Sequence, residues 1–368
     1  MILKHFSATN YRNLLTVNID FSPNVNCLVG ANGMGKSNVL DAIYYLSFCR
    51  GFASAQDATN LNHDSDFFML EGDYELETGM KHHVNCAMKR GVRKRIKVDG
   101  KDLKRISEHV GKIPLVMIAP ADSALILGGS EERRRFMDTV IMQYSTSYLE
   151  AIIKYDNALK QRNALLKQDN EPDAAVMDVL EEMLSVSGQI IYEARKQFIN
   201  EFLPIFTNLY ARLSGNEADE QASIVYRSHG ERGELLPQLA SFRAKERIVG
   251  YTLHGTHKDD LELLLNGFAV KREASQGQQK TFFIAMKLAQ FMFLKGKGEH
   301  RVPLLLLDDI FDKLDANRVA RIIDYVSSED FGQIFITDTH REHLDNILAL
   351  TMRDYKLFSV VNGEVLCL

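Results

Sequence analysis

The chain has 368 residues, of which 45% are hydrophobic and 25% are charged, and its formal net charge is −5. This length predicts two or three domains, and the composition is that of a soluble globular protein with a sizeable core. No run of about 18 apolar residues occurs, so we expect no membrane span. The four scattered cysteines include no Cys-x-x-Cys pair, which favours a reducing, cytoplasmic location and argues against a zinc site.

The first part of the chain, residues 1–121, is predicted to be a β-rich lobe with one helix. Its opening, MILKHFSATN, alternates apolar and polar residues, which is typical of a strand and unlike a signal peptide. The one helix is predicted over Ser37–Phe48, with an apolar stripe along one face. Strands are predicted at Ile2–Ser7, Leu15–Phe21, Val25–Val29, Phe67–Glu75, His82–Lys89 and Arg93–Val98, the last followed by a tight turn at Asp99-Gly100.

The second part, residues 122–245, is predicted to be a mainly helical inserted subdomain. Two long amphipathic helices, Glu131–Lys167 and Pro172–Leu213, are separated by the polar segment QDNEP. Both are several times longer than the mean helix of about 11–12 residues, so a helical hairpin is expected. A short strand, Ser223–Tyr226, and another helix follow.

The third part, residues 246–368, returns to an α/β pattern. Leu261–Leu265 is a strand candidate, and Ser275–Lys295 is a helix that is apolar almost all round and is therefore expected to be buried. Val302–Leu307 and Gln333–Thr337 are continuous apolar strands, as in a parallel sheet that is covered on both faces. A last strand is predicted within Tyr355–Leu368.

The strongest motif follows the strand Val25–Val29 and matches the phosphate-binding pattern G-x-x-x-x-G-K-[ST]. Its position between an apolar strand and an amphipathic helix is the context that this pattern requires. Glycines let backbone N–H groups turn inward around phosphates, and the helix N-terminus adds partial positive charge. The predicted ATP-binding set is Gly30, Ala31, Asn32, Gly33, Met34, Gly35, Lys36, Ser37 and Asn38. Lys36 is expected to reach the β- and γ-phosphates, and the Ser37 hydroxyl to ligate Mg²⁺.

A second motif is the apolar strand LLLL followed by Asp308 and Asp309. A buried strand that ends in two carboxylates suits a Walker B element. Asp308 is expected to hold Mg²⁺ through water, and Asp309 to orient or deprotonate the attacking water. Taken alone, the pair is also compatible with a helix N-cap after a core strand.

A third segment, Ser275-Gln276-Gly277-Gln278-Gln279, opens the apolar helix that precedes Asp308. A serine followed by a glycine is common at helix starts, so by itself the segment predicts only an N-cap. Its order between the other two motifs favours the signature of ABC-type ATPases, in which a helix N-terminus faces the nucleotide bound by the other subunit.

These motifs together resemble the RecF family, which belongs with the SMC-type heads of the ABC ATPases. The resemblance spans nearly the whole chain in the family's order. It implies an α/β P-loop NTPase of the ABC/SMC head type, with a mixed β N-terminal lobe and an inserted helical subdomain. The matching stretches besides those above are Asn10-Tyr11-Arg12-Asn13, Arg50-Gly51, Arg93–Gly100, Gly128-Gly129, Arg133–Phe136, Gly255–Asp260 and Asp312–Asp315.

The resemblance also implies roles for individual residues. Ser275, Gln276, Gly277 and Gln278 would contact ATP across a dimer interface, with Ser275 counted among the catalytic residues beside Lys36, Asp308 and Asp309. The loop Asp312–Asp315 would link the two ATP sites. Arg12 would approach the phosphates, although a surface salt bridge is an equal alternative.

Some positions depart from the family or stay open. Many ABC ATPases have glutamate where this chain has Asp309, so slow hydrolysis is expected. Thr256 stands where the family's Gly-Pro-His run has proline, which puts the geometry of that loop in doubt. His340 is either a γ-phosphate sensor or a solvent-exposed loop residue, and Asp122 is either a contact to Mg²⁺-bound water or an ordinary loop residue.

The stretch Lys89–Arg105 holds nine basic and two acidic residues. It predicts either a solvated sheet face or a surface that contacts the phosphate backbone of DNA without reading sequence. The candidates for such contacts are Lys89, Arg93, Arg95 and Lys97, of which the last three alternate along one strand face. No aromatic residues interleave them, so base stacking is not expected.

The expected function is that of a slow, Mg²⁺-dependent and DNA-stimulated ATPase that dimerises with ATP and clamps single- and double-stranded DNA at gaps. By resemblance, it would help RecO and RecR to load RecA and would support the SOS response. Three alternatives share some of these features. The helical insert and the basic stretch argue against a transporter ATPase subunit, and no second acidic cluster supplies the metal site of a nuclease. A scaffold that binds ATP without turnover stays open because of Asp309.

Overall fold

The computed structural model describes residues 1–54, 56–215, 220–298, 302–311, 316–328, 330–339 and 354–368. The chain divides into two compact units. The first comprises residues 1–123, 212–216 and 280–368, and the second comprises residues 124–211 and 217–279. Among the described residues, no helix has the length and apolar character needed to cross a membrane.

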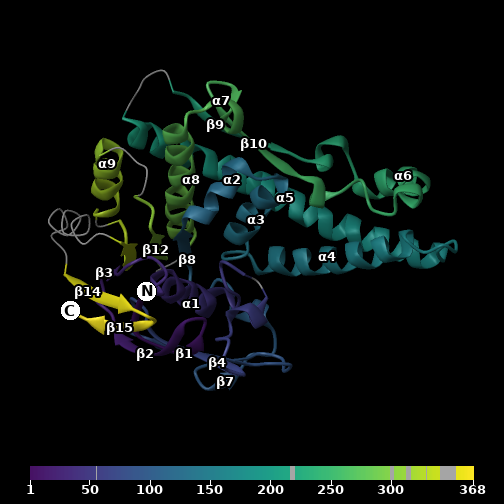
Figure 1. The fold of residues 1–368 in the computed structure, drawn as a ribbon. Coiled ribbons are helices and arrows are strands. Elements are labelled where there is room, and N and C mark those ends of the chain that lie inside the picture. The colour runs from purple at the N-terminus through teal and green to yellow at the C-terminus, as the bar shows by residue number, and fades with distance from the viewer. Residues whose placement is uncertain (55, 216–219, 299–301, 312–315, 329, 340–353) are drawn as a thin grey trace. The chain divides into compact units, whose positions relative to one another are not determined.

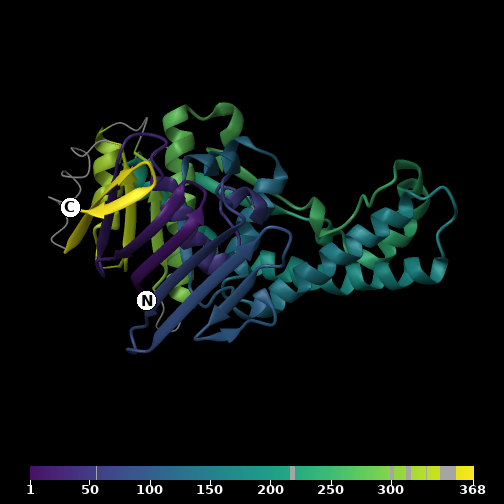
Figure 2. The same ribbon diagram turned by 60° about the horizontal axis from the view of Figure 1, so that its bottom comes forward.

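The first unit contains an antiparallel sheet with strand order β2-β1-β4-β5-β6-β7 (Figure 2). Buried and exposed residues alternate along these strands, because one face of the sheet is covered and the other is wet. The strands are β1 (Ile2–Tyr11), β2 (Leu14–Asp20), β4 (Phe67–Glu75), β5 (Lys81–Lys89), β6 (Arg95–Val98) and β7 (Lys101–Asp102). The predicted turn at Asp99-Gly100 is present, and both of its residues have positive φ.

A second sheet of this unit has the order β15-β14-β3-β13-β12-β8, and all neighbours are parallel except β15 and β14. Every residue of β8, β12 and β13 is buried, which accounts for their continuous apolar runs. Since β3, β13 and β12 are adjacent and parallel, the residues that follow them share one edge of the sheet. The strands are β3 (Val25–Val29), β8 (Leu115–Ile118), β12 (Leu304–Asp308), β13 (Ile334–Asp338), β14 (Tyr355–Val361) and β15 (Glu364–Cys367).

Helix α1 (Lys36–Phe48) contacts strands of both sheets (Figure 1). The helix is therefore buried on nearly all sides. The sequence predicted one buried apolar stripe, whereas in the structure Asp41 and Tyr45 are buried as well as Leu40 and Ile43. Helix α9 (Ala316–Val326) also belongs to this unit, and helix α8 (Gln276–Lys297) contributes most of its length to it.

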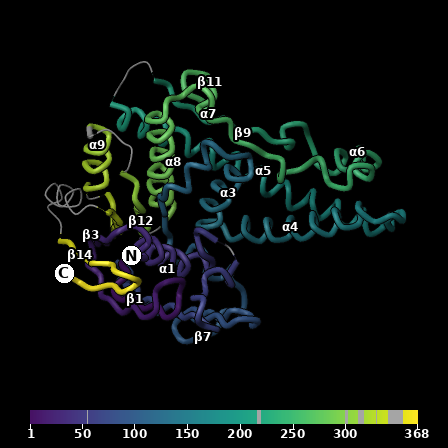
Figure 3. The backbone as a smooth tube through the Cα atoms, in the orientation of Figure 1, coloured from purple at the N-terminus to yellow at the C-terminus, as the bar shows by residue number. Residues whose placement is uncertain are grey.

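The second unit is mainly helical and includes a three-stranded antiparallel sheet of order β11-β10-β9 (Figures 1 and 3). Its helices are α2 (Ala124–Leu127), α3 (Ser130–Ile141), α4 (Thr146–Leu166), most of α5 (Ala174–Ser214), α6 (Leu235–Val249) and α7 (Val270–Glu273). Its strands are β9 (Ala222–Arg227), β10 (Asp260–Leu265) and β11 (Phe268–Ala269).

The structure corrects the single long helix predicted over Glu131–Lys167, because two helices occupy that segment. Helix α3 ends at Ile141, and α4 begins after Ser145, whose side chain accepts a hydrogen bond from the Tyr148 backbone N–H. This serine cap is the physical reason for the break, since it satisfies a backbone donor that a continuous helix would have used. The segment between the helices contains neither proline nor glycine, so the break had no strong signal.

The grouping of residues 246–279 also differs from the prediction. The sequence assigned them to the C-terminal lobe, whereas the structure places them in the second unit with the helices. The reason is strand pairing: β10 pairs with β9 from Asp260↔Arg227 to Leu265↔Ala222, so a boundary at residue 245 would divide one sheet.

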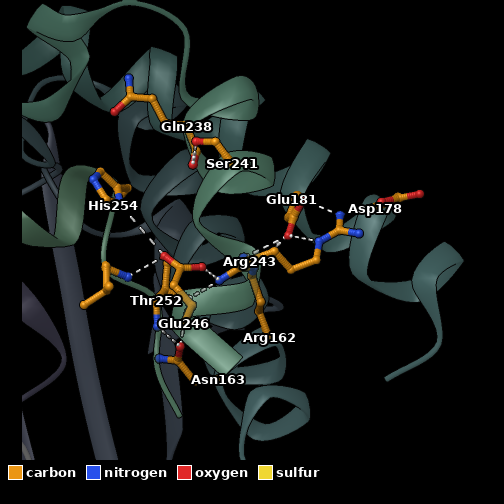
Figure 4. Close-up of polar contacts among 11 residues, drawn as sticks. Arg162, Asn163, Asp178, Glu181, Gln238, Ser241, Arg243, Glu246, Thr252 and His254 are labelled. Atoms are coloured by element: carbon orange, nitrogen blue, oxygen red, sulfur yellow. Dashed lines mark hydrogen bonds and ion pairs between the residues drawn. The ribbon is translucent and has the colours of Figure 1, made fainter. Parts of the chain in front are cut away.

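A buried ion-pair cluster joins α4, α5 and α6 in the second unit (Figure 4). The fully buried guanidinium of Arg162 lies 2.8 Å from Glu181 and 2.7 Å from Glu246. Arg243 on α6 adds a second contact to Glu181 at 2.6 Å. Charges without such partners would be costly to bury, so the cluster fixes how these three helices pack.

Candidate nucleotide-binding site

The loop between β3 and α1 has the backbone that the phosphate-binding pattern requires. Gly33 and Gly35 have φ of 79° and 114°, a region that residues with a Cβ rarely adopt. A Cβ on Gly30 would lie 2.2 Å from the Val360 carbonyl oxygen, so only glycine fits beside β14. The loop is therefore built around positions that tolerate no side chain.

The Lys36 side chain folds back over this loop. Its Nζ donates hydrogen bonds to the carbonyl oxygens of Gly30 at 2.6 Å and Ala31 at 3.0 Å. Burial lowers the pKa of Lys36, and the carboxylates of Asp309 and Asp308 oppose that shift. The ammonium is thus held beside the loop by weak neutral acceptors, and an anion that binds there would be a better partner for it.

The end of β12 lies against this loop and against β13. The Asp308 carboxylate accepts hydrogen bonds from the Ser37 hydroxyl at 2.8 Å and from the Thr337 hydroxyl at 2.7 Å. Burial raises the pKa of Asp308, although both hydroxyl donors act in the opposite direction. Lys36, Ser37 and Asp308 therefore converge at the shared edge of the parallel sheet, as the two motifs predicted.

Asp309 follows with an unusual backbone conformation. Its φ is 49°, and its N–H donates to the Thr337 hydroxyl at 3.1 Å. Thr337 thus contacts both acidic residues and was not singled out from the sequence. The only available signal was its place at the end of the apolar strand β13, where a polar residue faces the edge that carries the site.

Arg12 forms a salt bridge, but with a buried partner and not at the surface, where one of its two predicted alternatives had placed it. Its guanidinium lies 3.0 Å from the buried Asp41 carboxylate and donates to Asn38 and Asn60 at 3.2 and 2.9 Å. Asn38 in turn donates to Asn13 at 2.7 Å. The guanidinium is therefore anchored one residue away from Ser37, and the salt bridge positions it there without excluding a phosphate contact.

The signature segment lies in the second unit and caps α8. The Ser275 hydroxyl accepts a hydrogen bond from the Gln278 N–H at 3.2 Å, and the Gln278 side chain accepts one from the Ser275 N–H at 2.8 Å. This reciprocal pair is a capping box. Ser275 and Gln276 are exposed, and Gly277 is partly exposed. The helix start predicted from the segment is confirmed, while its role across a dimer interface stays a prediction.

Two groups of candidates remain in the first unit: Asp122, and residues that the structure does not describe. The Asp122 carboxylate accepts from the Ala119 N–H of its own turn at 3.0 Å and lies 3.7 Å from the Lys287 ammonium, so it is tied to the end of β8. The loop Asp312–Asp315 and His340 lie outside the described residues.

The basic stretch forms part of the antiparallel sheet, but its charges are not equivalent. The guanidinium of Arg95 makes a two-pronged ion pair with Asp102, with both N–O distances 2.6 Å. Lys94 is turned inward and donates to the Cys49 carbonyl at 2.6 Å. Lys89 and Arg93 are exposed and Lys97 is partly exposed, and Arg93 precedes β6 instead of lying within it. Of the four predicted DNA contacts, Arg95 is thus already paired with an acid.

Two of the segments that resemble the RecF family, Arg133–Phe136 and Gly255–Asp260, contact each other inside the second unit. Arg133 pairs with Asp260 at 2.6 Å, and Arg134 donates to the Asp259 carbonyl at 2.7 Å. The buried Arg195 of α5 bonds the Asp259 carboxylate at 2.8 Å and the Thr256 carbonyl at 2.8 Å. The arginine run and the run Gly255–Asp260 therefore act within this unit as its internal framework, and a threonine is accommodated at the position where proline was expected.

Comparison with known proteins agrees with this geometry. The sequence model of the RecF/RecN/SMC N-terminal domain matches residues 2–361. The chain is 51% identical over 365 residues to the DNA replication and repair protein RecF of Phocaeicola vulgatus, which covers 99% of this chain and 98% of that protein. It is 46% identical over 366 residues to the RecF of Porphyromonas gingivalis, covering 99% and 100%. The chain belongs to the RecF family.

Solved structures of the RecF family extend the match to the fold. A structure of the recombination mediator protein RecF with ATPrS, from the RecFOR pathway, superimposes with a TM-score of 0.88 at 26% identity, covering 100% of this chain and 98% of the other. The Smc head domain of Pyrococcus furiosus shares the fold alone, with a TM-score of 0.58 at 16% identity and coverage of 100% and 96%. The chain thus has the ATP-binding ABC/SMC-type head fold of the RecF family.

Proposed function

We propose that this chain is an ATP-dependent DNA-binding protein of recombinational repair and replication in the cytoplasm. The observation that carries the proposal is the convergence of Lys36, Ser37 and Asp308 at one sheet edge. That edge offers glycine N–H groups, a helix N-terminus and a buried ammonium to the phosphates of ATP. The RecF structures solved with ATP and ATPrS support the choice of nucleotide.

The donor set at Asp308 fits Mg²⁺. A buried carboxylate and an adjacent hydroxyl supply the oxygen ligands that this ion prefers, and the ion keeps several waters of its own. In this proposal Ser37 and Asp308 exchange their mutual hydrogen bond for the ion. Bound Mg²⁺ would supply charge neutralisation at the phosphates. Lys36 would leave the carbonyls of Gly30 and Ala31 for the phosphates.

Hydrolysis is proposed to be slow and to depend on Asp309. Its carboxylate would orient the attacking water, and its backbone is held by Thr337. An aspartate reaches less far than the glutamate of many ABC ATPases, so positioning of the water would be poorer. Arg12, anchored by Asp41, would add positive charge near the phosphates.

We further propose that ATP joins two copies. Ser275, Gln276, Gly277 and Gln278 of one copy would face the nucleotide of the other, and the closed dimer would clamp single- or double-stranded DNA at gaps. DNA would stimulate turnover, and hydrolysis would release the clamp. The chain would help RecO and RecR to load RecA at gaps and would support the SOS response. The solved relatives, which are named as RecF of the RecFOR pathway, support the choice of RecO and RecR as partners.

DNA affinity tests this proposal directly. Fluorescence anisotropy of a labelled gapped duplex should show tighter binding with Mg²⁺-ATP than without it, most strongly for Asp309→Asn, which would bind ATP without turnover. Lys36→Met should lose the ATP effect. If Mg²⁺-ATP leaves the affinity of the Asp309→Asn protein unchanged although ATP binds, the clamp proposal fails and a nucleotide-dependent scaffold replaces it.

The basic sheet offers a matched control. Each phosphate contact that is lost reduces the slope of log affinity against log salt by about 0.9. Arg93→Ala with Lys97→Ala should therefore reduce the slope by nearly two units, whereas Arg95→Ala should change it little because Asp102 already neutralises that guanidinium. Equal effects of the two variants would remove the proposed role of this surface.

A further inference from the structure

The side chain of Thr337 lies between the two motifs of the nucleotide-binding site. Strand β13 stands between β3, which leads into the phosphate-binding loop, and β12, which ends in the acidic pair. In this register Thr337 is opposite Asp308 on β12 and Leu28 on β3. Thr337 is thus the residue of the central strand that stands level with the end of β12.

The one hydroxyl of Thr337 contacts both acidic residues. It donates to the Asp308 Oδ1 at 2.7 Å and accepts from the Asp309 N–H at 3.1 Å. A hydroxyl has one proton and two lone pairs, so donating the proton to Asp308 leaves a lone pair for Asp309. Thr337 is fully buried, at 0% exposure, so bulk water does not compete for either contact.

The contact with Asp309 holds an uncommon backbone conformation. Asp309 has a φ of 49°, in the left-handed region that few residues other than glycine adopt. The hydrogen bond from its N–H to Thr337 fixes the peptide that precedes this turn of the chain. Because φ sets the direction of the Cα–Cβ bond from that peptide, the same hydrogen bond sets the direction of the Asp309 side chain.

We propose that Thr337 is a positioning residue that orients both acidic side chains of the ATP site, Asp308 toward Mg²⁺ and Asp309 toward the attacking water. This inference rests on the proposed function, in which Ser37 leaves Asp308 for the ion. Ser37 and Thr337 donate to the same carboxylate oxygen, Oδ1. Once Ser37 has left, Thr337 keeps that oxygen in place. Partners that hold a metal ligand in this way change metal affinity or activity by roughly 10–100-fold when they are removed.

Three variants isolate the hydroxyl. Thr337→Val keeps the branched shape that suits a strand but leaves Asp308 and the Asp309 N–H without this partner. Thr337→Ser keeps the hydroxyl and removes only a methyl group. Thr16→Val is the matched control, because it makes the same change at an exposed position of β2, in the other sheet of the unit.

Calorimetric titration gives the ATP affinity with EDTA and with Mg²⁺, and the ratio of the two is the gain due to Mg²⁺. With EDTA all four proteins should bind ATP alike, because Lys36 and the loop glycines are unchanged. The gain should fall by about tenfold in Thr337→Val and stay within about threefold of wild type in Thr337→Ser and Thr16→Val. In ATPase assays, kcat should also fall by about tenfold in Thr337→Val, with KM little changed.

A double variant separates positioning from a general effect on the fold. Asp308→Asn should itself remove the Mg²⁺ gain, so adding Thr337→Val should lower it no further. A Thr337→Val protein with the wild-type gain and kcat overturns the proposal. So does one whose ATP affinity falls equally with EDTA and with Mg²⁺, or a serine variant that behaves like valine. A wild type without Mg²⁺ gain or turnover would instead refute the Mg²⁺ site of the proposed function, and this inference with it.

Discussion

Replacing His257 with asparagine should remove a large part of the acid sensitivity of the second unit. The His257 ring accepts a hydrogen bond from the Tyr155 hydroxyl at 2.7 Å and donates one to the Thr252 carbonyl at 3.1 Å. The bond from Tyr155 requires the neutral ring, whereas the bond to Thr252 would persist on protonation; burial lowers the pKa of His257 from 6.5 to about 4. Gly255, which precedes it, packs so closely on Tyr155 that a Cβ there would lie 2.1 Å from the hydroxyl.

The magnitude follows from the two pKa values. The unfolded chain binds the proton more tightly than the folded one, so the stability contributed by the neutral ring is complete above pH 6.5 and is lost as pH falls toward 4. Between about pH 7.5 and pH 5 this linkage amounts to a loss of roughly 2 kcal/mol in the free energy of unfolding. His257→Asn should have lower stability at neutral pH, but its stability should fall about 2 kcal/mol less over that interval.

Urea unfolding followed by far-UV circular dichroism measures this, since the chain has no tryptophan. The control is His63→Asn, which replaces an exposed histidine and should keep the pH dependence of wild type. An equal loss of stability between neutral and acidic pH in the His257 variant and in wild type would refute the assignment of a buried neutral ring.

Three further substitutions have expected outcomes that follow from a buried ion pair, a close backbone contact and a buried ammonium. Arg162→Met leaves the buried Glu246 carboxylate without its guanidinium partner, while Arg243 still pairs with Glu181, and should cost about 3–5 kcal/mol in urea unfolding. Gly30→Ala would force a methyl group against the Val360 carbonyl and should lower the melting temperature in calorimetry and abolish ATP binding; a variant that binds ATP normally would contradict the loop geometry. Lys36→Met should also lose ATP binding in calorimetric titration, yet without nucleotide it should melt no earlier than wild type, because a buried ammonium is removed.

The sequence predicted the elements that carry the site well, for a physical reason. Strand β12 opens with four leucines, and β3 is apolar apart from Asn26. Pattern and chemistry therefore agree at Gly30 and at Asp308, which follow or end these strands. The resulting contact between Ser37 and Asp308 is present at 2.8 Å. The alternation of β4 and β5 was equally clear, because only one face of their sheet is covered.

Other features depended on partners far away in the chain. Strand β8 is only Leu115–Ile118, too short to stand out, and it exists because β12 pairs with it. The salt bridge of Arg12 could not be predicted from the sequence, because nothing local shows that Asp41, on the helix after the loop, is buried beside it. Likewise, the division between the units follows the pairing of β9 with β10, which no local pattern announces. The sequence predicted an amphipathic helix for α5, and only the structure shows that apolar side chains such as Val179 and Val186 lie exposed on it.

Mass photometry at nanomolar concentration tests the central claim, dimerisation driven by ATP, most directly. The account predicts that Mg²⁺-ATP converts the 41.8 kDa monomer of the Asp309→Asn protein to a dimer that retains gapped DNA. Adding Ser275→Arg should abolish both while ATP binding at Lys36 persists. A protein that binds ATP but stays monomeric, with or without DNA, would contradict an ATP-driven clamp.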